Sequence, residues 1–330
     1  MTIRIDLGDR SYDVIVEKGC MEKASELLNL NRKVLIVTDD GVPSDYSESL
    51  AEQCKDAVLV KLPQGESSKN ITNYELLQNR MLDEGFTRAD CVVAVGGGMV
   101  GDISGFAAST YMRGIDFYNI PTTLLSQADS SIGGKTAINL GGAKNIVGTF
   151  WQPKAVLIDS ATLQTLPDDQ IASGMAEIIK SGLISDAELF EMIENQANTN
   201  LEDLLIRSLL VKKHVVEEDE REGGLRRILN FGHTIGHGIE SVTGILHGHA
   251  VALGMTLMCS DEVRERLLGV MDSCRLPLSI DCDKDAVYKA VLSDKKMKDG
   301  KIGAVRVEEP GTCEIVDYTP DELRKRIERL

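Results

Sequence analysis

Four of the five histidines of this 330-residue chain lie within residues 230–249, and clustered imidazoles of this kind are common metal ligands. His233 and His237 stand four residues apart, so both side chains lie on one face of a helix. This spacing permits joint chelation of one ion, and it leaves His247 and His249 open as alternative ligands. The HExxH pattern of zinc proteases is absent, because a threonine follows the first histidine. The segment indicates a metal centre of another design, with unrelated polar histidines on a helix as the plainer alternative.

A carboxylate could complete a three-ligand catalytic site that keeps one coordination position open. Glu177 is a candidate, and it shares a helical face with Lys180, three residues further on. By itself, such a pair is also typical of an ion pair on the protein surface.

A strand that runs into glycines and then into a helix indicates a nucleotide site. Within residues 91–102, Gly96, Gly98 and Gly101 satisfy the GxGxxG pattern. Glycine lets the backbone approach a pyrophosphate, and the helix N-terminus offers free N–H groups and a positive dipole end. The acidic residue expected about twenty positions later is not cleanly present, so Asp39 is the candidate ribose partner instead. We expect a nucleotide pocket that differs from a standard Rossmann unit, against the alternative of a tight structural turn.

A second glycine-rich segment, residues 129–145, suits a phosphorylated ligand. Its Gly-Lys-Thr triplet is not a P-loop, because Asp129 stands where that motif requires its first glycine. The segment still carries Lys135, Lys144 and Asn145 on loops that expose the backbone, which favours phosphate binding. An ordinary surface loop is the alternative.

These candidates require a scaffold, and the first half of the chain reads as strands alternating with helices. Apolar strands separated by helices predict a parallel sheet that is covered on both faces, a doubly wound architecture. In its first two strands apolar and polar residues alternate, and two such strands in succession predict a hairpin. We expect strands at residues 3–7, 12–16, 33–38, 58–62 and 91–95, and helices at 43–53 and 71–84.

After about residue 160, long helical periodicities replace the strands. We therefore predict two domains, an α/β nucleotide-binding domain at 1–160 and a mainly α-helical domain for metal and substrate at 161–330. The junction of two such halves is a common place for a ligand. We expect helices at 168–181, 186–196, 201–220, 230–242 and 249–268, with a late strand pair at 302–307 and 313–316.

Composition narrows the class of protein. With 36 basic and 52 acidic residues the net charge is −16, which would repel nucleic acid and anionic membranes. No apolar run is long enough to cross a bilayer, and charges occupy the positions where a signal peptide would be apolar. The seven cysteines form no CxxC pair, so neither a disulfide framework nor a cysteine zinc site is indicated. A cytoplasmic enzyme is the simplest interpretation.

Taken in order, the motifs resemble those of the 3-dehydroquinate synthase family, from about residue 38 to residue 296. The glycine turn and the histidine segment alone would also admit the wider sugar-phosphate cyclases and the iron-dependent alcohol dehydrogenases. The motifs that carry the resemblance are GExxK at 65–69, GGGxxGD at 96–102, YMR at 111–113, PTTLLxQ at 121–127, the segment 129–139, AEIIK at 176–180 and LNFGHTxGH at 229–237.

The resemblance implies that Zn²⁺ (or Co²⁺) is bound by Glu177, His233 and His247, and it moves His237 from the metal to the substrate phosphate. His249 stands where the family usually has an acidic residue, which makes it a competing candidate ligand. The resemblance also implies an NAD⁺ site in the first half of the chain. Its residues would be Asp39, Gln64, Gly65, Glu66, Lys69, Gly97, Gly98, Met99, Val100, Gly101, Asp102, Thr122, Thr123, Lys135, Lys144, Thr162, Leu163, Gln164 and Thr165.

The implied substrate is a sugar-phosphate acid, and the implied assembly is a homodimer in which Arg113 reaches the partner's site. The substrate contacts would be Lys135, Asn145, His237, Lys295 or Lys296, and Arg113 for the phosphate; Lys212 and Arg226 for the carboxylate; and Asp129, Lys180, Glu222 and Asn230 for the hydroxyls.

The family reaction converts 3-deoxy-D-arabino-heptulosonate 7-phosphate to 3-dehydroquinate and phosphate, with transient oxidation by NAD⁺, phosphate elimination, re-reduction and aldol closure. A net dehydrogenase of a polyol or glycerol phosphate is a rival, although it would not need Lys212 and Arg226. A cyclase that acts on a neutral sugar phosphate is a second rival. An NAD-responsive sensor would not require all the metal ligands and lysines that are present. The chain departs from the family near residues 308–310, which are more polar than the apolar strand usual there.

Overall fold

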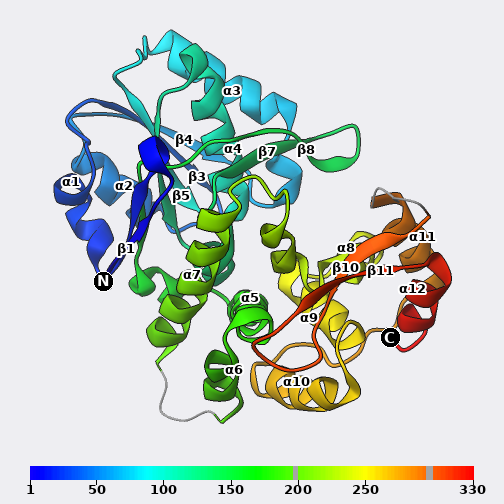
Figure 1. The fold of residues 1–330 in the computed structure, drawn as a ribbon. Coiled ribbons are helices and arrows are strands. Elements are labelled where there is room, and N and C mark those ends of the chain that lie inside the picture. Colours follow the sequence, from blue (N-terminus) through cyan, green and yellow to red (C-terminus); the bar gives the residue numbers. More distant parts are fainter. Residues whose placement is uncertain (196–199, 295–299) are drawn as a thin grey trace. The chain divides into compact units, whose positions relative to one another are not determined.

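The computed structural model describes residues 1–195, 200–294 and 300–330. The chain divides into two compact units, Met1–Leu166 and Pro167–Leu330 (Figure 1). The change in hydrophobic pattern lies near residue 160, and the units divide after Leu166.

Unit 1 is built on a seven-stranded sheet with the strand order β1-β2-β9-β6-β5-β3-β4. Only β1 and β2 pair antiparallel, as the predicted hairpin, and the other neighbours are parallel. The strands are β1 (Thr2–Ile5), β2 (Tyr12–Val16), β3 (Lys33–Asp39), β4 (Asp56–Leu62), β5 (Cys91–Gly96), β6 (Asp116–Pro121) and β9 (Ala155–Ile158). The helices are α1 (Ala24–Leu27), α2 (Ser44–Glu52), α3 (Ile71–Asp83) and α4 (Gly98–Thr110).

The middle of the central strands β3 and β5 is a continuous apolar run because both faces of the sheet are covered. In β3, Leu35 and Val37 join the core under α3 and α4, whereas Val34 and Ile36 join the core under α1 and α2. Side chains alternate between the faces of a strand, so each face needs its own apolar set. The doubly wound fold is confirmed.

The glycine-rich segment, predicted as loops, instead forms a second, two-stranded sheet. Strands β7 (Lys135–Leu140) and β8 (Ala143–Phe150) pair antiparallel around Gly141 and Gly142. Both glycines have positive φ, 60° and 81°, which suits the tight turn of a hairpin. The segment is therefore an ordered hairpin that presents its polar side chains from fixed positions.

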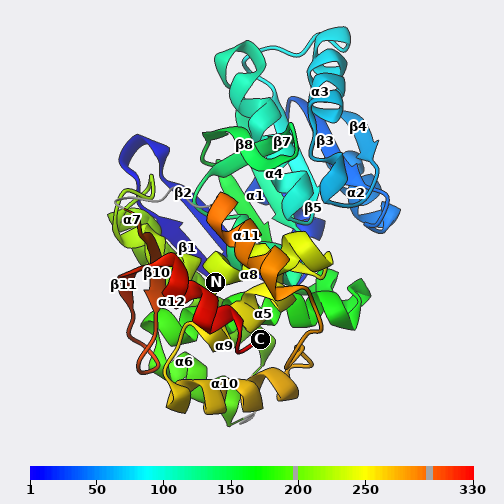
Figure 2. The same cartoon turned by 90° about the vertical axis from the view of Figure 1, so that its right-hand side faces the viewer.

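Unit 2 is mainly helical, as predicted. Helix α5 contacts α6, α7 and α9, while α8 packs against α9 and α11. Strands β10 and β11 pair antiparallel and run side by side in both views (Figure 1, Figure 2). The elements are α5 (Asp168–Ser185), α6 (Ala187–Glu194), α7 (Leu201–Glu218), α8 (His233–Thr243), α9 (His247–Leu257), α10 (Asp261–Ser273), α11 (Lys284–Asp294), β10 (Ile302–Arg306), β11 (Glu314–Tyr318) and α12 (Pro320–Ile327).

The single helix predicted at 249–268 is wrong, because α9 and α10 are separate helices there. Between them, Cys259 forms a parallel bridge with Val307, just beyond β10. The Ser260 N–H donates to the Val307 carbonyl at 3.0 Å, and its side chain then caps α10. The apolar periodicity continues across this break, which hides the pairing from the sequence.

Candidate active site

Three imidazoles converge at the start of two neighbouring helices. His233 and His237 lie on α8 and His247 opens α9, and one ring nitrogen from each lies within 4.8 Å of the others. Helix α8 begins at His233 rather than at residue 230, because Gly232 adopts a left-handed φ of 78°. His249, the fourth histidine of the segment, is not part of the group that the described residues form. Burial lowers its pKa.

Helix α5 adds a carboxylate to this cluster. Glu177 is buried, and its Oε1 lies 3.8 Å from His233 Nε2 and 3.5 Å from His247 Nε2. Its other oxygen contacts the ammonium of Lys180, which is also buried. The two residues are not the surface ion pair that spacing alone allows.

The Nδ1 atoms of two of the imidazoles, which face away from Glu177, each lie within hydrogen-bond distance of an oxygen atom. His233 Nδ1 lies 3.0 Å from the Phe231 carbonyl oxygen, and His247 Nδ1 lies 2.9 Å from Glu240 Oε2. Metal-binding histidines usually have such an outer acceptor, which orients the ring and directs Nε2 toward the ion. Glu240 is not among the residues predicted from the sequence, although its position three residues after His237 on α8 could have indicated it.

The pKa shifts of Glu177, His233 and His247 favour the binding of a cation. Burial by itself would raise the pKa of Glu177, but Lys180 and the two imidazoles hold it well below its usual value. Burial holds the pKa of His233 well below its usual value. The pKa of His247 is raised to about 9 despite burial, because Glu177 and Glu240 favour the imidazolium. At neutral pH a metal ion would therefore meet a carboxylate and a neutral imidazole, and it would displace one proton from His247.

Two glycines allow the helices of the cluster to approach closely. A Cβ atom on Gly248 would lie 1.9 Å from the Ser173 carbonyl oxygen of α5. A Cβ atom on Gly254 would lie 2.0 Å from the Gly232 carbonyl oxygen, just before α8. Helix α9 therefore packs backbone to backbone against its neighbours, and this packing brings His247 to Glu177 and His233.

The loop after α7 carries several of the predicted substrate residues. Asp219 accepts backbone N–H groups from Gly223 at 2.8 Å, Gly224 at 2.6 Å and Arg226 at 3.0 Å. Glu222, held with a positive φ of 62°, accepts from Asn230 Nδ2 at 2.7 Å. The loop leads into the 3₁₀ helix η7 (Leu225–Asn230), in which the Arg226 side chain is buried.

Lys212 is buried on α7, which contacts both α5 and η7. The hydroxyls of Ser181 and Ser208 meet at 2.9 Å between α5 and α7. The structure thus brings three buried cations, Lys180, Lys212 and Arg226, onto elements of unit 2 that contact one another.

In unit 1, the predicted nucleotide residues gather at the carboxyl ends of neighbouring strands. β3 ends at Asp39, β5 at Gly96 and β6 at Pro121, directly before Thr122. Gly97 is the N-cap of α4, so the glycine turn ends on a helix N-terminus, where an anion is favoured. The carboxyl edge of a doubly wound sheet is the usual ligand site of this architecture.

Lys69 links two of these predicted residues. Its buried ammonium lies 2.9 Å from Asp102 Oδ2 and 3.0 Å from Glu66 Oε1. Burial alone would lower the pKa of Lys69, but the two carboxylates raise it, so the ammonium stays charged. Asn139, which the sequence analysis did not assign, donates to Glu66 Oε1 at 2.9 Å and accepts from the Asn145 N–H at 2.8 Å.

Other predicted residues of unit 1 occupy four places. Gln64 and Gly65 follow β4, and residues 162–165 lie in the 3₁₀ helix η6 (Ser160–Thr165). Gln127 Nε2 donates to the Pro121 carbonyl oxygen at 3.1 Å and to the Thr162 hydroxyl at 3.1 Å, which holds η6 beside the end of β6. Asp129 lies in the helical turn η5 (Ser126–Ser130), while Lys135, Lys144 and Asn145 are exposed on the β7–β8 hairpin.

Of the predicted phosphate-binding residues that remain, the structure describes Arg113 but not the two lysines. Arg113 is exposed, with a positive φ of 70°, and follows Met112, whose φ is 49°. Two successive non-glycine residues in this region are strained, which is typical of functional segments. Lys295 and Lys296 lie outside the described residues.

Family models match most of the chain. The model described as 3-dehydroquinate synthase N-terminal matches residues 59–173, and the one described as 3-dehydroquinate synthase C-terminal matches residues 174–297. The 3-dehydroquinate synthase of Streptococcus pneumoniae is 41% identical over 350 aligned residues, covering 98% of this chain and 99% of its own. That of Thermoanaerobacter sp. is 42% identical, with 98% of each chain covered.

Solved structures agree in fold. 2-Deoxy-scyllo-inosose synthase, complexed with carbaglucose-6-phosphate, NAD⁺ and Co²⁺, matches with a TM-score of 0.89 at 26% identity over 100% of both chains. 2-Epi-5-epi-valiolone synthase from Streptomyces hygroscopicus, with NAD⁺ and Zn²⁺ bound, matches at 0.88 and 30% identity over 98% of both. A glycerol dehydrogenase from Schizosaccharomyces pombe shares the fold at a TM-score of 0.64 and 15% identity, covering 96% of this chain and 88% of its own. Among the described residues, no helix is both long and apolar enough to cross a membrane.

Proposed function

The chain belongs to the 3-dehydroquinate synthase family, and we propose that it converts 3-deoxy-D-arabino-heptulosonate 7-phosphate to 3-dehydroquinate and phosphate. The main structural support for this choice is the pair of buried cations Lys212 and Arg226 in unit 2. A site for a neutral polyol has no use for these two groups, whereas a substrate with a carboxylate does. The rival dehydrogenase is therefore the weaker candidate.

The donor set fits a divalent metal and NAD⁺. We assign Glu177, His233 and His247 as the metal ligands, because both imidazoles have outer acceptors and both face the carboxylate. The glycine turn at 97–102 would hold the pyrophosphate and Asp39 a ribose. Bound together, metal and nucleotide would supply reversible oxidation of a substrate carbinol, whose ketone form makes the adjacent C–H bond acidic.

The chain's own residues would then bind, orient and stabilise charge. Lys212 and Arg226 would pair with the substrate carboxylate, and Lys180 would stay an ammonium beside Glu177. His237, Lys135 and Asn145 would hold the phosphate as charge develops on it, with one of Lys295 and Lys296. Asp129, Lys180, Glu222 and Asn230 would contact hydroxyls. Ring closure then needs mainly the correct conformation of the bound product.

Phosphate release tests the reaction. We expect the purified chain, with NAD⁺ and Zn²⁺, to release inorganic phosphate from the heptulosonate phosphate without net build-up of NADH, because the hydride returns to the substrate. A coupled phosphate assay and absorbance at 340 nm measure the two quantities. Steady accumulation of NADH on a polyol would instead support the dehydrogenase. Phosphate release only from sugar phosphates without a carboxylate would support the other cyclases.

Asp219 should act by holding the loop that carries Glu222 and Arg226. In Asp219→Asn an amide NH₂ replaces one of the two acceptor oxygens, so one or two of the three backbone N–H bonds are lost, and we expect kcat/KM to fall about 10- to 100-fold. Metal content and NAD⁺ affinity should not change. Glu218→Gln, at the exposed neighbouring carboxylate, is the matched control. An equal loss in both variants would contradict this role.

We propose a homodimer in which Arg113 contributes to the partner's phosphate site. Its exposure and its strained backbone support this role. Arg113→Ala and His247→Ala should each be inactive, and an equal mixture should recover about a quarter of wild-type activity, because half the dimers carry one intact site. No recovery, in a mixture shown to exchange subunits, would place Arg113 within its own subunit or outside the site.

We also propose the cytoplasm as the compartment. All seven cysteines are free thiols, and reducing compartments keep thiols in this form.

A further inference from the structure

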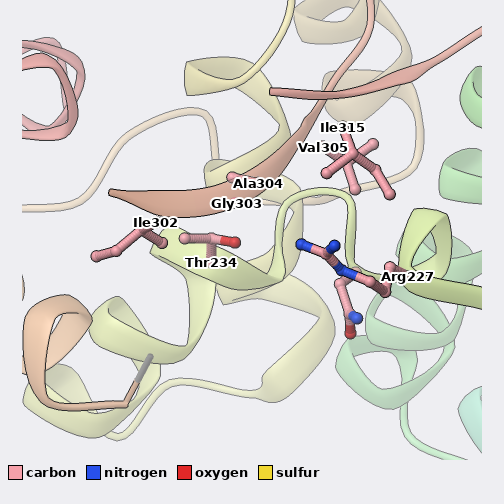
Figure 3. A pocket seen from close by; sticks show the side chains of 8 residues that line it. Arg227, Thr234, Ile302, Gly303, Ala304, Val305 and Ile315 are labelled. Carbon is pink, nitrogen blue, oxygen red and sulfur yellow. The ribbon is translucent and has the colours of Figure 1, made fainter. Parts of the chain in front are cut away.

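Unit 2 contains a small cavity that shares only Asn230 with the proposed substrate residues. Its volume is about 170 Å³, and it is lined by residues 302–305 of β10, Ile315 of β11, Arg227 and Asn230 of η7, and Thr234 of α8 (Figure 3). Nothing in the proposed reaction uses Arg227 or Thr234.

Two hydrogen-bond donors face each other across this cavity. Figure 3 shows the Thr234 hydroxyl and the Arg227 guanidinium pointing toward one another. Thr234 is only 3% exposed as a residue, whereas Arg227 is exposed, and in the described parts of the chain no side-chain hydrogen bond or ion pair occupies either group. An acceptor placed between the guanidinium and the hydroxyl would be stabilised by both.

Gly303 gives the guanidinium its position. A Cβ atom there would lie 2.4 Å from Arg227 Nη2, so the guanidinium lies directly over Gly303 and a larger residue would displace it. The same Cβ atom would lie 3.3 Å from Asp317 Oδ1, on the strand partner of Gly303. Asp317 is therefore one negative charge near the cavity, and Glu222, whose Oε1 accepts from Asn230 of the lining at 2.7 Å, is a second; both would oppose an entering anion.

The rest of the lining decides the kind of ligand. Ile302, Val305 and Ile315 present aliphatic surface, which an inorganic anion cannot use. Pockets for drug-sized molecules measure about 300–1,000 Å³, so this cavity is too small for a nucleotide. A guanidinium and a hydroxyl can together hold one carboxylate. We propose that this cavity binds a small monocarboxylate, with its carboxylate between Arg227 and Thr234 and its apolar body against β10 and β11.

The test uses the full chain loaded with Zn²⁺ and NAD⁺, and benzoate as the probe in isothermal titration. We expect binding that weakens at least about tenfold in Arg227→Met, the loss of one charge-assisted pair. Gly303→Ala should weaken it too, by displacing the guanidinium. Asp317→Asn should tighten it several-fold. Arg221→Met, at an exposed arginine outside the lining, is the matched control and should leave binding unchanged.

Three results would overturn the proposal. Equal benzoate affinity in wild type and Arg227→Met would remove the arginine from the site. Loss of binding in Lys212→Met but not in Arg227→Met would place benzoate on the proposed substrate anchors. Inorganic phosphate that binds more tightly than benzoate, and whose binding is lost in Arg227→Met, would exclude an apolar ligand. None of these readouts depends on turnover, so the proposal stands or fails separately from the proposed reaction.

Discussion

His247→Ala should lose both bound metal and turnover. The substitution removes an imidazole whose Nε2 lies 3.5 Å from Glu177 Oε1 and whose Nδ1 is oriented by Glu240. A catalytic metal supplies several kcal/mol of charge stabilisation, so we expect the rate of phosphate release to fall on the order of a thousandfold. Metal content after dialysis, measured by atomic emission, and the rate at saturating NAD⁺ are the two readouts.

His249→Ala is the matched control, because it removes an imidazole two residues away on the same helix turn. Since His249 lies outside the imidazole group, the variant should keep its metal and most of its activity. The reverse pattern, with metal lost from His249→Ala and retained in His247→Ala, would show that the ligand assignment is wrong.

Gly248→Ala should destabilise unit 2 and weaken metal binding together. The new Cβ atom would lie 1.9 Å from the Ser173 carbonyl oxygen, so α9 must move away from α5 and carry His247 with it. Overpacking of this kind costs about 3 kcal/mol. For a unit of this size, that cost lowers the melting temperature by about 6–12 °C. Differential scanning calorimetry with and without Zn²⁺ measures the shift.

Gly269→Ala, in the same unit, should raise the free energy of unfolding rather than lower it. Gly269 lies within α10, and nothing lies within 4 Å of the position its Cβ would occupy. Alanine there should stabilise by about 0.4–1 kcal/mol, because it restricts the unfolded chain. If both glycine variants melted at the same temperature, close helix contact at Gly248 would not be the cause of the loss.

The parts of the fold that follow from local pattern could be predicted. Strands β3 and β5 contain continuous apolar runs because both faces of the sheet are buried, and the helices of unit 2 show clear periodicity. The break between α9 and α10 could not be predicted, since Cys259 is held by Val307, a residue distant in sequence. The β7–β8 hairpin differs from the loops that the sequence predicts, because its strands carry lysine, asparagine and glycine and β8 is largely exposed.

In the candidate site, too, the features set by local spacing could be predicted and those set by tertiary packing could not. Helical spacing correctly placed His233 and His237 on one face of a helix, but it could not bring His247 or Glu177 to them. That meeting depends on the close packing of α5 and α9 at Gly248, a tertiary contact without a local pattern. The burial of the Glu177–Lys180 pair is of the same kind, because the same spacing occurs on exposed helices.

The strand order of unit 1 has a consequence for its synthesis. β2 pairs with β9 and β9 with β6, so the first two strands have no place in the sheet until Ala155–Ile158 has been made. At about 5–20 residues per second, the N-terminal hairpin waits several seconds outside the ribosome, with its apolar face uncovered. A nascent chain that stalls before Ala155 would thus present two open sheet edges, and it should be a stronger chaperone client than one that stalls after Leu166.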